Sequence, residues 1–190
     1  ISATGRLVVT VEDYDHQGEV QAGNLTLASA GDIRLGADVE WKLAGEASLS
    51  AAAAFSNAGI LSSADNLVLH AAVIDNQGSL AARNDLNVTA PTITNHAGAL
   101  MLSGQNLTLT ATEVTNAGDL YAMIDLVLSG ADESAAHRLL NAGGFIGTGQ
   151  GDIDLHATHI INTGVGEFLG DITWGESQIS FPGSDVGDGY

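Results

Sequence analysis

The chain has 190 residues, of which 45% are hydrophobic, and this size fits a single domain better than two independent cores. With 23 acidic against 5 basic residues the formal net charge is −18, which excludes nucleic-acid binding and adsorption to anionic lipids, and no apolar run is long enough for membrane insertion. Cysteine is absent, which excludes disulfides and thiolate metal sites.

The first segment alternates apolar and polar residues, beginning with Leu7, Val9 and Val11. This is the period of a strand with one buried face. A similar arrangement returns in later segments, where asparagine stands at the position that His16 occupies here. Because residues 1–5 lack the charged and apolar regions of a signal peptide, we expect the chain to be a piece of a longer protein.

The next segment, residues 24–45, is irregular because it lacks the Asn-x-Gly element that the other units carry at a corner. It alternates strictly through Ile33, Leu35, Ala37, Val39, Trp41 and Leu43. This pattern allows one long strand, a hairpin that projects, or a corner variant whose charges form a solvated face. Since tryptophan is enriched at binding hot spots and two cations stand beside it, Arg34, Trp41 and Lys42 are candidate partner-binding residues.

The clearest units follow in the middle of the chain. Residues 66–84 read N-L-V-L-H-A-A-V-I-D-N-Q-G-S-L-A-A-R-N and align without a gap with residues 106–124, N-L-T-L-T-A-T-E-V-T-N-A-G-D-L-Y-A-M-I. Each unit predicts two or three short strands. Because the motif returns in the same order, the chain is expected to wind into an all-β parallel β-helix over residues 1–174, with about nine coils of about twenty residues and a length on the order of 43 Å.

An asparagine recurs once per unit beside a glycine, as in Asn57-Ala-Gly59. Glycine can adopt a positive φ at such a corner, and asparagine caps local backbone groups. Stacking in register would place these asparagines in one column, where their amides can hydrogen-bond from coil to coil. The expected structural ladder contains Asn57, Asn76, Asn95, Asn116, Asn141 and Asn162.

Two later segments depart from the repeat. An inserted loop is expected at residues 130–141, and the stretch from Asp132 to Leu140 is compatible with one or two helical turns. Inserted loops in repeat proteins often carry contacts, so His137 and Arg138 are candidate partner-binding residues, although tolerated extra length explains the loop equally well. Residues 175–190 lose the repeat and are expected to form a capping or linker tail.

Candidate sites for metal ions are weak. The pair His156 and His159 has no carboxylate at a suitable spacing. The glycine-rich residues 147–152 are similar to a calcium-binding turn but occur once, whereas such sites need tandem copies. We expect no metal site and no cofactor.

Catalysis is the main alternative, because parallel β-helices also host polysaccharide lyases and hydrolases. Such sites need clustered carboxylates, and a lyase usually needs a nearby cation. The densest acidic set is Asp32, Asp38 and Glu40, with Arg34 and Lys42 close by in sequence. An ion-paired surface would have the same composition, so we expect no catalytic residues and keep a polysaccharide-active enzyme as the alternative.

The motif N-L-T-L-x-A-x-x-V-x-N-x-G-x-L-x-A at residues 106–122, with close copies beginning at Asn66 and Asp152, resembles the haemagglutinin repeats of filamentous haemagglutinin and of contact-dependent inhibition toxins. The resemblance extends to about Gly170. It implies a right-handed parallel β-helix that passes the outer membrane by two-partner secretion. The dedicated transporter would be recognised through a region outside this chain.

The resemblance also implies a role. Proteins with such repeats form filaments that are secreted or exposed on the bacterial surface, and they serve adhesion or present a receptor-binding or toxin region to other cells. The expected partner is therefore a cell-surface receptor or glycan on a target cell. The resemblance does not identify that receptor.

Overall fold

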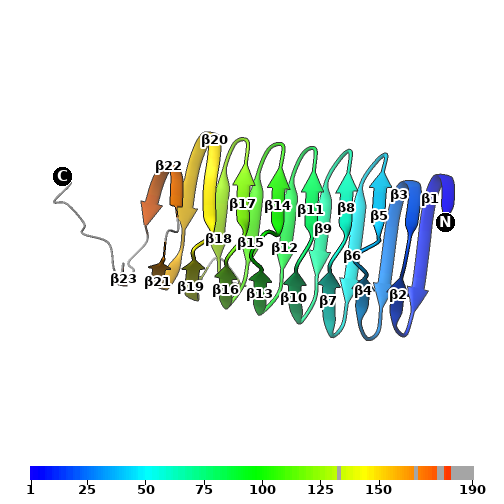
Figure 1. Ribbon diagram of the computed structural model, residues 1–190, viewed down its shortest axis with the longest axis horizontal. Helices are drawn as coiled ribbons and strands as arrows, with labels where there is room; N and C mark the ends of the chain where they lie inside the picture. Colours follow the sequence, from blue (N-terminus) through cyan, green and yellow to red (C-terminus); the bar gives the residue numbers. More distant parts are fainter. Residues whose placement is uncertain (132–133, 165–166, 175–177, 181–190) are drawn as a thin grey trace.

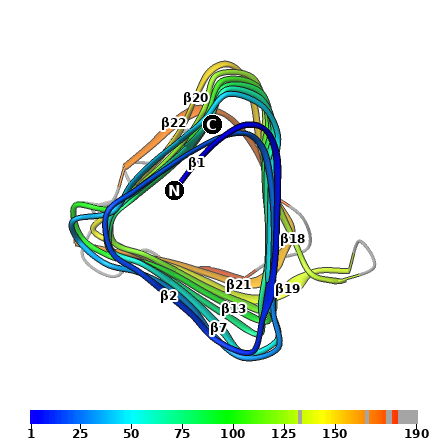
Figure 2. The same ribbon diagram turned by 90° about the vertical axis from the view of Figure 1, so that its right-hand side faces the viewer.

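The chain winds into a three-sided parallel β-solenoid with almost no helix. The computed structural model describes residues 1–131, 134–164, 167–174 and 178–180 (Figure 1). Viewed along its length, the solenoid is a triangle whose sides we call face 1, face 2 and face 3 (Figure 2). The described residues contain no long apolar helix of the kind that spans a bilayer.

Each face is a parallel sheet with one strand per coil. Face 1 contains β5 (Glu40–Leu43), β8 (Ile60–Ser63), β11 (Ser79–Ala82), β14 (Leu100–Ser103) and β17 (Asp119–Ala122). Face 2 contains β6 (Ala47–Ala51), β9 (Leu67–His70), β12 (Leu86–Thr89), β15 (Leu107–Thr110) and β18 (Leu126–Ser129). Four longer strands pass from face 1 into face 2: β1 (Ser2–Val11), β3 (Glu19–Ser29), β20 (Phe145–Leu155) and β22 (Glu167–Trp174).

Face 3 is a separate sheet that completes the triangle. It contains β2 (Tyr14–His16), β4 (Ile33–Leu35), β7 (Ala54–Asn57), β10 (Val73–Asn76), β13 (Thr92–Asn95), β16 (Glu113–Asn116), β19 (Ala136–Ala142), β21 (Ala157–Thr163) and β23 (Gln178–Ser180). Neighbouring strands pair so that equivalent residues lie side by side, as Ile74 does with Ile93 and Asn76 with Asn95. The predicted parallel β-helix of about twenty-residue coils is confirmed, and its right-handed path stays a prediction.

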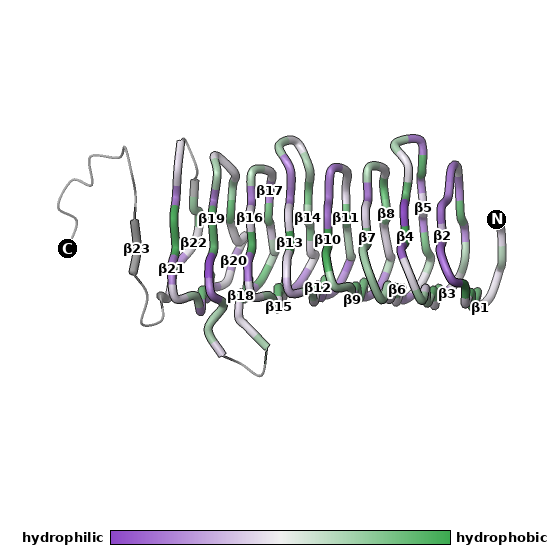
Figure 3. The backbone as a smooth tube through the Cα atoms, turned by 90° about the horizontal axis from the view of Figure 1, so that it is seen from below, coloured by the Kyte–Doolittle hydropathy of each residue, from purple (hydrophilic) through white to green (hydrophobic). Residues whose placement is uncertain are grey.

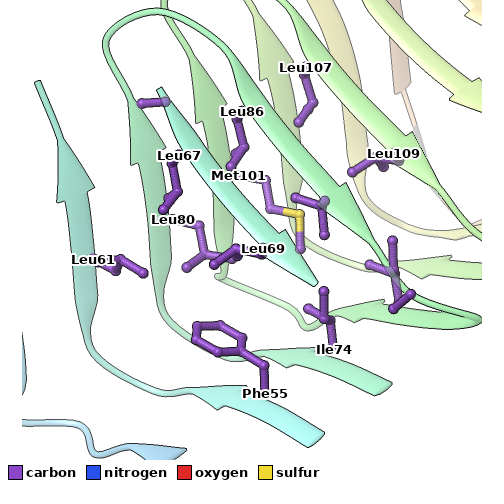
Figure 4. Packing of buried hydrophobic residues seen from close by; sticks show 14 of the residues in the cluster. Phe55, Leu61, Leu67, Leu69, Ile74, Leu80, Leu86, Met101, Leu107 and Leu109 are labelled. Carbon is purple, nitrogen blue, oxygen red and sulfur yellow. The ribbon is translucent and has the colours of Figure 1, made fainter. Parts of the chain in front are cut away.

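The alternation seen in the sequence becomes an inside and an outside. Hydrophilic and hydrophobic residues alternate along the coils (Figure 3). Inward residues form columns, such as Leu67, Leu86 and Leu107, that fill the interior with fully buried aliphatic side chains (Figure 4). Fully burying a side chain of this size contributes roughly 1.5–3 kcal/mol, so each coil is stabilised mainly by the coils on either side.

The irregular segment 24–45 is an ordinary part of the stack. After the end of β3, its residues form β4 and β5, joined by a corner in which the Val39 amide donates to the Gly36 carbonyl at 3.0 Å. Ala37 and Asp38 are exposed in that corner, which breaks the expected alternation. The long strand and the projecting hairpin are therefore wrong, and the segment is a corner variant.

The inserted loop leaves the stack between β18 and β19, at the corner of faces 2 and 3. Residues 130–131 and 134–135 extend outside the outline of the neighbouring coils (Figures 2 and 3). The expected helical turns are wrong from Ala136 onward, because these residues form β19 and Leu139 joins the core column between Val114 and Ile160. Residues 132–133 of that stretch lie outside the described residues.

The last described strand, β23, lies within residues 175–190, the expected capping or linker tail. Its residues pair in parallel with β21, with Ile179 opposite Ile160 in the register. The stack therefore extends into this segment. The other residues of the tail, 175–177 and 181–190, lie outside the described residues.

Leu107→Ala is expected to lower the free energy of unfolding by about 2–5 kcal/mol, because it opens a cavity between two neighbouring coils. Val73→Ala is the matched control, since Val73 is 42% exposed on face 3 and the change should cost less than about 0.5 kcal/mol. Urea unfolding followed by circular dichroism measures both. Equal losses would contradict the assignment of Leu107 to the core.

Candidate functional site

A ladder of buried asparagines follows the corner between faces 3 and 1. The side-chain Nδ2 of Asn57 donates to Oδ1 of Asn76 at 2.9 Å, and the same bond joins Asn76 to Asn95 at 2.8 Å and Asn95 to Asn116 at 2.9 Å. Asn116 donates to Asn141 at 2.9 Å, and Asn141 donates to Asn162 at 2.8 Å. The six asparagines singled out in the sequence are thus brought together in one column.

The ladder satisfies polar groups that would otherwise be buried without partners. Asn76, Asn95, Asn116 and Asn141 are 0% exposed. Each also donates to a main-chain carbonyl at the corner, as Asn95 does to Asp119 at 3.2 Å. Because burying an amide without hydrogen bonds costs about 1–3 kcal/mol, a column of this kind is stable only when the coils stay in register.

The glycines of this corner serve two different purposes. Gly98 and Gly143 adopt positive φ values of 79° and 80°, as the sequence predicts. Gly78 and Gly118 do not, so the prediction that glycine is needed for a positive φ is wrong at these two positions. A Cβ at Gly78 would lie 2.1 Å from the carbonyl oxygen of Gly59, so glycine is needed there because the coils approach closely.

A second polar column, which sequence reasoning missed, follows the corner between faces 1 and 2. The Asp85 amide donates to Oδ1 of Asn66 at 3.1 Å, and the Asn106 side chain donates to Oδ1 of Asp85 at 3.0 Å. Beside this column the Ser103 hydroxyl donates to the carbonyls of Asn84 at 2.6 Å and Asn106 at 2.8 Å. The signal was present in the sequence, since an Asn or Asp opens most units.

The cations of the irregular segment are exposed but already paired. Arg34 forms an ion pair with Asp32, and Lys42 lies 2.5 Å from Glu40, whose hydrogen bond raises the pKa of Lys42. A role of these two cations in partner binding stays a prediction. Exposed pairs of this kind contribute little to stability.

Trp41 is not available to a partner. Its indole is 1% exposed and points into the core, because Trp41 falls on the inward phase of β5. There it packs edge-on against the rings of Tyr14 and His16, with centroids 5.9 Å and 5.4 Å away. The expectation that Trp41 contacts a partner therefore fails, since alternation placed its side chain inside.

The candidates His137 and Arg138 lie on β19, next to the inserted loop. Arg138 is 3.6 Å from Glu113, and the ring of His137 lies 5.6 Å from that of His159. His137 is exposed and Arg138 half-buried, so both reach the surface of face 3. Their contact with a partner stays a prediction.

The residues considered for metal binding or catalysis are dispersed. His156 pairs with Asp154 at 2.9 Å, whereas His159 packs against His137. Asp32 and Asp38 lie at opposite ends of β4. Within the described parts of the chain, no three His, Asp or Glu side chains are placed to hold a metal ion.

Comparison with known proteins gives one match. A family model described as a haemagglutinin repeat matches residues 1–37, 43–79 and 71–173, which together make up most of the chain. No curated protein matches, and no solved structure matches.

Asn95→Leu is expected to lower the free energy of unfolding by about 1–3 kcal/mol for each buried group it deprives of a partner, here Nδ2 of Asn76 and Oδ1 of Asn116. Asn87→Leu is the control, because Asn87 faces outward on β12 and should change stability by less than about 0.5 kcal/mol. Urea unfolding of both variants measures the difference. A similar small effect in both would show that the ladder does not stabilise the stack.

Proposed function

The chain belongs to the haemagglutinin repeat family, and on this premise we propose that it is a segment of a secreted, surface-exposed bacterial filament that contacts target cells. The repeat and the β-helix both fit a filament or adhesin segment. In the proposed role the segment gives the filament length and exposes its three faces to other cells. It can also hold a binding or toxin-delivery region at a distance from the secreting cell.

One observation supports this proposal above the others: the pairing keeps its register from coil to coil. Ala54, Val73, Thr92 and Glu113 follow one another along face 3, one residue per coil. Added coils therefore lengthen the rod without changing its cross-section. A packed core and three long outer faces give the rod length and exposed surface, which suits a filament.

The route of secretion is part of the same proposal. We infer that the chain passes the outer membrane by two-partner secretion, with its transporter recognised through a region outside this chain. A parallel solenoid can fold coil by coil as it emerges, because each coil needs only its neighbour as a template.

The enzyme alternative is disfavoured by the arrangement of the carboxylates. Glu40 pairs with Lys42, Asp32 pairs with Arg34, and Asp38 stands apart in an exposed corner. A hydrolase needs two such groups directed at one bond of the substrate, and a lyase needs a base placed beside the proton that it removes.

We expect the chain to release no unsaturated uronate from polygalacturonate or alginate, measured by absorbance at the ultraviolet band of the lyase product. Asp32→Asn, Asp38→Asn and Glu40→Gln provide the controls. Turnover by the parent chain that one of these variants abolishes would establish an enzyme and overturn the filament proposal.

The adhesive part of the proposal predicts saturable binding of the fluorescently labelled chain to intact bacterial or epithelial cells. An excess of unlabelled chain should displace it, because a specific contact has a limited number of sites. An unrelated acidic protein of similar size is the control and should displace none. Binding that never saturates, or its absence from both cell types, would leave a spacer without adhesive activity.

A further inference from the structure

Face 1 of the last coils carries a row of apolar side chains on its outer surface. The row begins at Leu102 on β14 and continues through Tyr121 on β17, Phe145 on β20 and Leu169 on β22, strands that are neighbours in the stack (Figure 1). Leu169 is 59% exposed, and the other three are half-buried. A stable solenoid does not need apolar side chains on its outside, so the row calls for another explanation.

Two aromatic rings form the centre of this row. The rings of Tyr121 and Phe145 stack with centroids 6.4 Å apart and planes inclined by 21°. In the strand register Phe145 lies opposite Asp119, and Gly147 lies opposite Tyr121. The Phe145 ring nevertheless lies against Gly147, where an added Cβ would be 2.4 Å from a ring atom. Both rings therefore lie close to the axis of the row.

Glycines make this arrangement possible. A Cβ at Gly149 would lie 2.6 Å from the Tyr121 hydroxyl and 2.7 Å from Sδ of Met123. The glycine-rich segment 147–152 is thus the surface on which the aromatic side chains rest. This accounts for a motif that the calcium hypothesis did not explain.

A polar hollow adjoins the row at the corner of faces 1 and 2. It has a volume of about 380 Å³ and is lined by Thr148, Gly149, Gln150, Gly151, Gly170 and Asp171. Gln150 and Asp171 are exposed, whereas the Thr148 hydroxyl already donates a hydrogen bond to the Gly151 carbonyl at 2.6 Å. The hollow offers an amide, a carboxylate and main-chain groups beside two stacked rings.

We propose that the row and the hollow together bind a linear neutral glycan whose sugar rings lie along the rod. The C–H face of a β-linked hexose is apolar and weakly positive, so it packs on the negative face of an aromatic ring. Its hydroxyls point sideways, where Gln150, Asp171 and the glycine main chain can exchange hydrogen bonds with them. An apolar surface with a few placed polar groups is the usual composition of such sites.

Charge favours a neutral glycan over an anionic one. Asp119 is exposed beside the row and Asp171 lies in the hollow. The nearest cation along the stack is Arg83, which follows β11 and lies one coil before Leu102 but two coils before Tyr121. The one Lys or Arg after it in the sequence, Arg138, lies on face 3 beside Glu113. A sulfate or uronate bound over the rings and the hollow would therefore meet carboxylates, with the nearest cation two or more coils away.

Size favours a glycan over a protein partner. Four side chains cover much less than the roughly 800 Å² per partner of a stable protein interface. An aromatic pair across two strands also stabilises a sheet by itself, typically by about 0.2–1 kcal/mol. That role, however, requires neither an exposed Leu169 nor a polar hollow, so binding and stability must be measured separately.

The test is isothermal titration calorimetry of the chain with two neutral probes, cellohexaose and a β-1,4-linked galactohexaose, and with an oligogalacturonate of equal length as the charged counterpart. We expect at least one neutral probe to bind and the charged one to bind at least about tenfold more weakly, a difference of about 1.4 kcal/mol. Absence of binding to both neutral probes, or equal binding of the charged probe, would overturn the inference.

Variants locate the site. Tyr121→Ala, Phe145→Ala and Gln150→Ala should each weaken binding about five- to tenfold or more, whereas Tyr121→Phe should retain most of the affinity because it keeps the ring. Thermal unfolding of each variant reports its stability. Gln150 is exposed, so unchanged binding in Gln150→Ala, together with losses that only follow unfolding in the ring variants, would assign the rings a structural role and overturn the inference.

Val73→Ala is the matched control, because Val73 is an exposed apolar side chain on β10 of face 3 and should not affect binding to face 1. Loss of glycan binding in this variant would place the site away from face 1 and contradict the inference. Retained binding, with loss in the ring variants, supports face 1.

The inference rests on the proposed adhesive function, but the two can fail separately. If the chain binds cells but neither neutral probe, the adhesive proposal is supported and the proposed glycan site is wrong. If it binds a neutral probe through Tyr121 and Phe145 but binds no cells, the proposed glycan site is supported and the adhesive proposal is wrong.

Discussion

Every coil of this protein must present its backbone hydrogen-bonding groups at the height and register of the next coil, and the rest of the structure follows from that constraint. A residue inserted within a strand would move the inward side chains of the residues that follow to the outer surface, whereas an insertion at a corner leaves the strands in register. The extra residues are indeed at corners, as in the turn that ends at Gly98 and the loop between Ser129 and Ala136. The buried asparagine column reinforces the same register, because an amide displaced by one step would lose its partners on both sides.

The constraint on the inside leaves the outside free to vary. Outward positions do not affect stacking, so the faces can differ in charge and apolar content along the rod without changing its shape. Face 3 carries ion pairs and imidazoles near β19, whereas face 1 carries the stacked rings of Tyr121 and Phe145 over a glycine-rich strand. In the proposed filament, such local differences are where adhesive contacts would lie, whereas uniform coils would only add length.

The acidic character of the chain limits what those faces can bind. With a net charge of −18, long-range attraction to nucleic acid or sulfated polymers is absent over most of the surface, and recognition must depend on short-range contacts. Aromatic stacking and hydrogen bonding to neutral hydroxyls are contacts of this kind. Three of the five Lys and Arg residues, Arg34, Lys42 and Arg138, have a carboxylate partner, which further reduces their availability to an anionic ligand.

By itself the sequence determined the repeat, the alternation and therefore the parallel stack, because period and order are properties of the chain alone. It also placed the asparagines at one position per unit. The alternation put Trp41 in phase with Val39 and Leu43, and only the tertiary structure showed that this phase is buried in the core and not displayed on a projecting hairpin. The tertiary structure alone showed that Gly78 is required by a neighbouring carbonyl and that Tyr121 and Phe145 meet above Gly147. These last features are contacts between coils, whose residues are distant in sequence and come together only when one coil lies on the next.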